Sequence, residues 1–162
     1  MSDLQTLLRG PVDGGLGFVL VGGYAAMLHG SSLLTRDLDV CAMLAPDNVE
    51  KLREVFRDAH PVHRLSTPRR SFLDYPESGV TLQNLHLSTD LGTLDVLGRI
   101  DGVGDHARVA RNAVDIELFG RSVRAMSLDD LILAKEAPGR DKDRIAAREL
   151  RAIREMRDAP RS

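Results

Sequence analysis

Asp37 and Asp39 are two acidic residues whose spacing suits chemistry on a phosphate. They alternate with apolar residues in a segment expected to be a strand, where residues two apart project to the same side of a sheet. Two neighbouring carboxylates repel each other unless a cation lies between them, and Mg²⁺ prefers a few carboxylates together with phosphate oxygens. The pair therefore predicts a Mg²⁺ site that acts on a phosphate-bearing substrate.

Asp95 is the candidate for a third carboxylate at this site. Leu94 and Val96 are expected to face a core, so Asp95 faces the opposite side of what we interpret as a neighbouring strand. Two-metal phosphoryl-transfer sites hold their ions about 3.5–4 Å apart, where the ions clamp the attacking and leaving oxygens. A strand aspartate is commonly no more than part of a solvated face, so the interpretation depends on the three carboxylates occurring together.

Gly22 and Gly23 follow the apolar run 18–21 and precede a short helical pattern. A strand-to-helix turn made of glycines lets backbone N–H groups approach an anion closely, because no Cβ stands in the way. The start of the following helix adds partial positive charge. The glycine pair therefore predicts a seat for a phosphate group.

The elements that must position these residues alternate short apolar runs with amphipathic segments, which favours an α/β or α+β fold. The expected strands are 18–21, 37–43, 81–87, 93–97, 113–118 and 122–126. The expected helices are 2–9, 24–29, 45–59, 127–137 and 141–157. Residues 60–79 contain three prolines and are interpreted as a loop or weak hairpin that could touch a substrate.

Length and composition limit the function classes. With 162 residues, 43% of them hydrophobic, the chain is expected to form one domain (1–162), with a sheet core over about 17–126 and C-terminal helices over about 127–157. A single cysteine, Cys41, excludes an internal disulfide framework and a multi-thiolate zinc cluster. The five histidines lack metal-ligand spacing and are expected at the surface or in caps. Without a spanning apolar run or a signal-peptide pattern, we expect a cytoplasmic protein with no membrane contact.

The charge distribution limits how the chain could bind nucleic acid. The formal net charge is -2, so there is no global cationic field, and 4% aromatic residues with no tryptophan disfavour a base-stacking platform. From Lys135 onward, nine Lys and Arg stand against six Asp and Glu, so this segment is net basic and the preceding residues are net acidic. The basic segment either contacts RNA or a protein partner or is a solvated helix face.

The order Gly22-Gly23, Asp37-x-Asp39 and Asp95 resembles the DNA polymerase β-like nucleotidyltransferase superfamily over roughly residues 17–150. The segment 133–143 is similar to the lysine, arginine, lysine-aspartate signature of its AbiEii-like toxin-type branch. The resemblance implies a nucleotidyltransferase fold, in which a mixed β-sheet is flanked by helices and followed by a C-terminal helical pair. It also implies transfer of a nucleoside monophosphate from an NTP, with release of pyrophosphate.

The resemblance implies two Mg²⁺ ions held by the three aspartates. Asp37 and Asp39 would bind both ions. Asp95 would hold the catalytic ion and help to deprotonate the acceptor hydroxyl. Some members of the branch are toxins of toxin–antitoxin pairs that modify tRNA, and other relatives adenylylate aminoglycosides or proteins.

The resemblance further implies which residues hold the NTP. Gly22 and Gly23 would seat the triphosphate. Lys135, with Arg140 or Lys142, would neutralise phosphate charge from the C-terminal helices, as an ammonium and a guanidinium fork do well.

The chain departs from the pattern of the superfamily at Leu33. Relatives often carry an arginine at this position, two residues before the threonine that precedes the first aspartates. Either Arg36 or the loop arginines Arg69 and Arg70 supply the missing cation near the nucleotide, or the affinity for nucleotide is lower.

We therefore expect a Mg²⁺-dependent nucleotidyltransferase that modifies an acceptor hydroxyl, with RNA or tRNA as the first expected acceptor. An antitoxin protein and a second copy of the chain are further expected partners. Two alternatives stay open. One is a catalytically silent module of the same fold that binds a nucleotide or a protein. The other is a small-molecule adenylyltransferase of the aminoglycoside type, which predicts an acidic pocket for a cationic acceptor.

Overall fold

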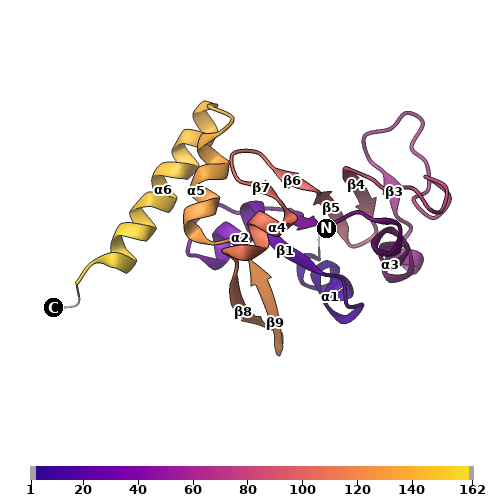
Figure 1. Cartoon of the computed structure of the whole chain (residues 1–162), viewed down its shortest axis with the longest axis horizontal. Coiled ribbons are helices and arrows are strands. Elements are labelled where there is room, and N and C mark those ends of the chain that lie inside the picture. The colour runs from indigo at the N-terminus through magenta and orange to yellow at the C-terminus, as the bar shows by residue number, and fades with distance from the viewer. Residues whose placement is uncertain (1–2, 161–162) are drawn as a thin grey trace.

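A mixed seven-stranded sheet organises the chain in the computed structural model, which describes residues 3–160 (Figure 1). The strand order across this sheet is β3-β4-β5-β2-β1-β9-β8. Its strands are β1 (Phe18–Val21), β2 (Asp37–Ala42), β3 (Val62–His63), β4 (Asn84–Thr89), β5 (Gly92–Leu97), β8 (Val114–Leu118) and β9 (Arg121–Ala125). A separate two-stranded ribbon pairs β6 (Arg99–Ile100) with β7 (Gly104–Asp105).

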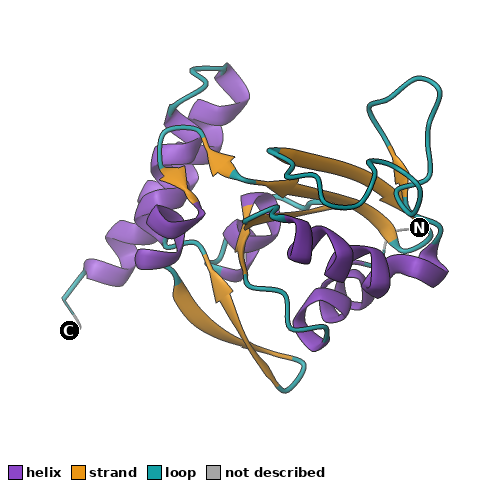
Figure 2. Cartoon of the chain, turned by 45° about the vertical axis from the view of Figure 1, so that its right-hand side comes forward, coloured by secondary structure: helices purple, strands orange, loops and turns teal. Residues whose placement is uncertain are grey.

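Helices flank this sheet and extend beyond one end of it (Figure 2). They are α1 (Leu4–Asp13), α2 (Gly22–Leu28), α3 (Pro46–Phe56), α4 (His106–Arg111), α5 (Leu128–Glu136) and α6 (Asp141–Asp158), with a 3₁₀ turn η1 (Arg57–Ala59) after α3. The C-terminal pair α5 and α6 pack side by side at the opposite end of the molecule from the loop that follows β3 (Figure 1). No helix within residues 3–160 is long and apolar enough to cross a bilayer.

The centre of the sheet is the parallel pair β2 and β5, flanked by antiparallel β1 and β4. Alternate residues of these strands face a buried core covered by α1, with α3 beside it. Leu38, Val40, Leu94 and Val96 are fully buried there. The polar residues between them must project from the other face, because successive side chains alternate across a strand.

Most of the expected elements are confirmed, and the differences lie in segments where a few hydrogen bonds decide the conformation. Residues 81–83 are not part of a strand, and β4 begins at Asn84 instead. The Leu82 N–H donates to the Leu44 carbonyl at 3.0 Å, and the Gln83 carbonyl accepts from the Gly98 N–H at 2.9 Å. These residues are therefore bonded to connecting segments and not to the neighbouring strand.

Two other segments differ from expectation. The first helix, which was expected to end at residue 9, continues through Gly10-Pro11 to Asp13, where the Gly14 N–H donates to the Gly10 carbonyl and closes the last turn. Residues 99–111 form β6, β7 and α4 where no element was expected. These elements span two to six residues, so they contain too few residues for a hydrophobic period, and α4 buries only Val109.

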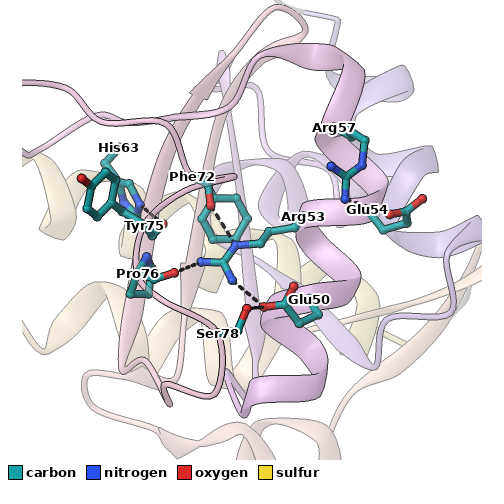
Figure 3. A network of polar contacts seen from close by, with 9 residues as sticks. All are labelled: Glu50, Arg53, Glu54, Arg57, His63, Phe72, Tyr75, Pro76 and Ser78. Carbon is teal, nitrogen blue, oxygen red and sulfur yellow. Dashed lines mark hydrogen bonds and ion pairs between the residues drawn. The ribbon is translucent and has the colours of Figure 1, made fainter.

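Arg53 on α3 anchors the 64–79 loop, meaning the segment from Arg64 to Gly79 (Figure 3). Only 4% of Arg53 is exposed. Its Nε donates to the Phe72 carbonyl at 2.8 Å, its guanidinium also donates to the Pro76 carbonyl, and it forms an ion pair with Glu50. Because this buried cation binds two carbonyls of an otherwise irregular loop, we expect the position of the loop to depend on that side chain.

We expect Arg53→Met to lower the free energy of unfolding by about 2–4 kcal/mol, since two carbonyls lose a charged donor and Glu50 loses its cation. Urea denaturation measures this change, and limited proteolysis should cleave within the 64–79 loop. Arg57→Met is the matched control. Arg57 lies on the turn directly after the same helix and forms an exposed pair with Glu54 at 3.2 Å, so its loss should change stability by no more than about 0.5 kcal/mol. Equal effects of the two substitutions would contradict the anchoring role.

Candidate active site

Asp39 and Asp95 are direct partners in the register of the parallel pair β2 and β5, and Asp37 is opposite Thr93. All three carboxylates lie on the face opposite the core, since Leu38 and Leu94 are buried on the other side. The structure therefore brings together the three acidic residues that the sequence singled out, although Asp95 is far from the other two along the chain. Their roles as metal ligands and catalytic groups remain predictions.

Burial and the neighbouring carboxylates perturb the pKa of Asp39. Burial raises the pKa of Asp39, the negative charges of Asp95 and Asp37 raise it further, and Lys135 lowers it, so that the pKa reaches about 6 against an ordinary value of 3.8. A hydrogen bond to the Asp95 carboxyl group also favours the protonated form. Ionised Asp39 thus has an unfavourable environment that a bound cation would relieve.

Asp95 is held by two side chains that the sequence analysis did not assign to the site. Its Oδ1 accepts from the Arg64 guanidinium and lies 2.9 Å from His86 Nδ1. The Asp95 side chain is 18% exposed, so these contacts fix one orientation of a largely covered carboxylate. His86 is therefore not in the surface or capping role that was expected. The sequence feature that could have identified His86 is its alternation with Leu85 and Leu87, because this alternation puts His86 on the polar face of the strand.

Gly22 has a conformation and a close contact that other residues tolerate poorly. Its φ is +65°, and a Cβ built there would overlap Asp39 Oδ2. A Cβ on Gly23 would instead lie 3.0 Å from the Thr35 Cβ. Both glycines are the first residues of α2, not a turn before it, and α2 has only seven residues. Gly22 thus lets the Asp39 carboxylate lie directly against the backbone.

A cavity of about 150 Å³ opens beside these residues, toward the C-terminal helices. Gly22, Asp39, Lys135, Arg140 and Asp143 are among its lining residues. Lys135 Nζ lies 3.9 Å from Asp143 Oδ1, and Arg140 Nε donates to Asp143 Oδ2 at 2.6 Å. Since Asp143 is only 3% exposed, it is a buried anion that holds two cations at the edge of the cavity.

Asp143 is a site residue to which the sequence analysis gave no role, although it belongs to the lysine-aspartate pair quoted there. The sequence feature that could have identified Asp143 is its i,i+3 spacing from Arg140 at the start of the predicted helix, since such a spacing lets two side chains meet. Lys142, which was expected to contact phosphate, is exposed and is not among the residues lining the cavity. The adjacent positions on α6 point about 100° apart, so only Asp143 can face the cavity while Lys142 faces away.

Arg36 and Gly23 are two further residues that are predicted to bind phosphate. Neither is among the residues lining the cavity, and Arg36 is exposed just before β2. Of the expected nucleotide-binding residues, Gly22, Lys135 and Arg140 therefore line one cavity with Asp39. Arg36, Gly23 and Lys142 do not.

The carboxylate donors fit Mg²⁺ better than a metal that needs a complete protein cage. Within residues 3–160, no three His, Cys, Asp or Glu side chains already surround one point as ligands. Asp39 and Asp95 nevertheless supply hard oxygen donors side by side, and their repulsion raises the pKa of Asp39. Mg²⁺ is usually bound by one or two carboxylates plus water and substrate phosphates, so an incomplete set of carboxylates beside a cavity that is also lined by Lys135 and Arg140 suits it.

Comparison with known proteins establishes the fold. Neither a protein-family model nor a curated protein matches the sequence. Among solved structures, the lincosamide antibiotic adenylyltransferase LnuA with lincomycin bound matches at a TM-score of 0.63 and 14% identity, over 93% of this chain and 96% of that chain. A putative nucleotidyltransferase from Thermotoga maritima matches at 0.55 and 17% identity, over 94% and 96%. The antibiotic-resistance factor ANT(2'')-Ia matches at 0.53 and 17% identity, over 94% and 88%.

These likenesses confirm the expected fold class. The chain has the nucleotidyltransferase fold, a mixed sheet flanked by helices with a C-terminal helical pair. The identities of 14% and 17% are low, so what these proteins act on is a matter separate from the fold.

We expect Gly22→Ala to displace the Asp39 carboxylate and to weaken Mn²⁺ binding, measured by electron paramagnetic resonance, by at least tenfold. Gly15→Ala is the matched control, because Gly15 has a similar φ of +73° but nothing within 4 Å of the added Cβ. Both variants should lose about 1 kcal/mol of stability from backbone strain. Only Gly22→Ala should lose metal affinity, and a loss shared by both variants would contradict the contact with Asp39.

Asp39→Asn should stabilise the metal-free protein in a pH-dependent way. Because the pKa of Asp39 rises from 3.8 to about 6 on folding, ionisation of Asp39 opposes folding, and this penalty grows as the pH rises from about 4 to 7. In EDTA, the variant should match the wild type near pH 4 and exceed it by about 1–3 kcal/mol at pH 8, measured by urea denaturation. Asp115→Asn, on β8, is the exposed control. A difference that does not grow with pH would contradict the raised pKa.

Proposed function

We propose that the chain is a Mg²⁺-dependent nucleotidyltransferase that transfers a nucleoside monophosphate from an NTP to an acceptor hydroxyl. The observation that carries this proposal is the register pairing of Asp39 with Asp95, next to Asp37, beside a cavity lined by Lys135 and Arg140. Carboxylates that repel each other and cations that face the same space are what a polyphosphate with its divalent ions requires. The nucleotidyltransferase fold of the chain supports the same conclusion.

In the proposed reaction the acceptor oxygen attacks the α-phosphorus of the NTP. The bond from this phosphorus to the bridging oxygen of the β-phosphate breaks, pyrophosphate leaves, and the acceptor proton passes to Asp95. Asp37, Asp39 and Asp95 would hold two Mg²⁺ ions, which neutralise charge on the triphosphate when bound. Little covalent chemistry falls to the protein, so positioned charges supply most of the rate enhancement.

Lys135 and Arg140 are the residues proposed to bind the triphosphate. Both are held by Asp143, and both line the cavity that adjoins Asp39. An ammonium acts as a point charge and a guanidinium as a planar fork, so together they can contact several phosphate oxygens. Because Asp143 is buried, the two cations keep their positions in the absence of substrate, which reduces the ordering that binding must otherwise impose.

Asp95 is proposed to accept the acceptor proton from a fixed position. Arg64 and His86 hold its Oδ1 and prevent the carboxylate from rotating freely. A general base works only within hydrogen-bond reach of the proton that it removes, so this positioning matters as much as its proton affinity.

A small-molecule adenylyltransferase is the second candidate. The observation that favours it is the likeness to LnuA and ANT(2'')-Ia, both named for antibiotic modification or resistance and matched over nearly their whole length. The toxin-type assignment, with an RNA or tRNA acceptor and an antitoxin partner, depends on the similarity of residues 133–143 to that branch. A silent binding module is disfavoured, because such a module has no need for converged carboxylates that make Asp39 costly to ionise.

The test is label transfer from each α-labelled NTP with Mg²⁺, in the presence of tRNA, short RNA, an aminoglycoside, lincomycin or a protein acceptor. Asp39→Asn should lower transfer and pyrophosphate release by at least 100-fold, since Asp39 would hold both ions. Asp115→Asn, another strand aspartate but an exposed one on β8, should retain wild-type activity.

Transfer that survives Asp39→Asn would remove the metal assignment. Mg²⁺-dependent NTP binding without transfer to any acceptor would favour the silent module. Transfer to lincomycin or the aminoglycoside alone would favour the small-molecule candidate.

A further inference from the structure

A second cavity lies on the other side of the three aspartates, under the 64–79 loop. It is an open groove of about 500 Å³ between this loop and β4. Leu65, Arg70, Tyr75, Asn84 and His86 are among its lining residues. Arg53 anchors the loop through the Phe72 and Pro76 carbonyls (Figure 3). The groove therefore has one fixed wall on the loop and another on the sheet.

The groove adjoins the reaction centre through one side chain. His86 lines the groove, is the register partner of Asp95 and lies 2.9 Å from it, while Asp95 is the register partner of Asp39. Across the sheet, the order is therefore groove, His86, Asp95, Asp39 and then the Lys135 cavity. The loop and the C-terminal helices accordingly lie at opposite ends of the molecule (Figure 1).

This arrangement places the groove where an acceptor has to enter. The attacking and leaving oxygens lie roughly in line on either side of the transferred phosphorus. If the pyrophosphate leaves on the side of Lys135 and Arg140, the acceptor oxygen must arrive from the side of Asp95. The groove lies on that side of Asp95, beyond His86.

The charged residues that line the groove favour one chemical class of acceptor. No Asp or Glu is among its lining residues, Arg70 lines it, and Arg64 covers Asp95 at its inner end. A polycation such as an aminoglycoside would therefore find no counter-charge along the wall, contrary to the acidic pocket that this candidate predicts. An acceptor with negative charge would be attracted instead.

The exposed side chains of the groove favour a ligand that has a flat ring next to its negative charge. The Arg70 guanidinium lies 4.6 Å from the centroid of the Tyr75 ring, and Tyr75 and Leu65 remain 47% and 66% exposed. Exposed aromatic and aliphatic surface next to an arginine suits a base together with its phosphate, because bases stack on aromatic and guanidinium planes.

We propose that this groove binds the acceptor and that the acceptor is a nucleotide unit, either free or at an RNA end. Its base packs against Tyr75 and Leu65, its phosphate contacts Arg70, and its ribose lies toward His86, the groove residue that contacts Asp95. This inference deepens the proposed function and depends on it only for the chemistry, since binding in the groove is measurable without an NTP.

The experiment measures fluorescence anisotropy of a labelled six-nucleotide RNA with the full chain in EDTA, at 50 and 200 mM salt, with a mononucleotide and an aminoglycoside as competitors. Arg70→Glu should weaken RNA binding at least tenfold and reduce its salt dependence. Tyr75→Ala should weaken it about 5- to 100-fold and Tyr75→Phe much less, because only the ring is needed for stacking. Arg57→Glu makes the same charge change outside the groove and should bind like the wild type. Urea denaturation confirms that each variant is folded.

Mg²⁺-dependent NTP affinity, measured separately, should be the same in Arg70→Glu as in the wild type. RNA binding that is lost in Arg70→Glu and kept in Arg57→Glu supports the groove as the acceptor site. If the chain binds RNA in this way but transfers no nucleotide, the proposed transferase activity is wrong and the proposed binding in the groove still holds. Competition by the mononucleotide at the affinity of the RNA identifies a free nucleotide, and weaker competition identifies an RNA end. RNA binding unchanged in Arg70→Glu, or an aminoglycoside that competes as well as the mononucleotide, overturns the proposal.

Discussion

Electrostatic repulsion between two carboxylates on neighbouring parallel strands is the constraint around which the site is built. Asp39 and Asp95 are register partners, and burial together with the negative charges of Asp95 and Asp37 raises the pKa of Asp39 to about 6. A protein can keep such a pair only if the surrounding sheet is rigid enough to hold it, and the buried core beneath β2 and β5 provides that rigidity. The unrelieved repulsion is in turn available to bind a divalent cation.

The charged residues around this pair are arranged so that each side of it has its own cations. Lys135 and Arg140 face the pair from the C-terminal helices, held by Asp143, and Arg64 faces it from the loop after β3. The two sides also have different cavities, a small one beside the helices and a wider groove under the loop. In the function that we propose, this asymmetry would separate the position of the triphosphate from that of the acceptor, with the carboxylates between them.

Several differences between the sequence analysis and the structure have one cause. Contacts between segments that are distant along the chain leave no local pattern in the sequence. His86 was assigned to the surface because its neighbours show no metal-ligand spacing, yet pairing of β4 with β5 puts it against Asp95. Lys142 was named through the resemblance as an alternative to Arg140, and it lies exposed on α6, whereas Asp143 is buried and contacts Arg140. The ribbon and short helix within residues 99–111 are likewise too short to produce a period.

The sequence by itself determined which strands carry the aspartates, the face on which each carboxylate lies, and the class of fold, because alternation and helical periodicity are local properties of the chain. Only the tertiary structure decided that β2 and β5 are parallel neighbours with Asp39 opposite Asp95, and that Arg64, His86 and Asp143 complete the site. Strand order and register depend on how distant segments pack over a shared core, and no window of neighbouring residues contains that information.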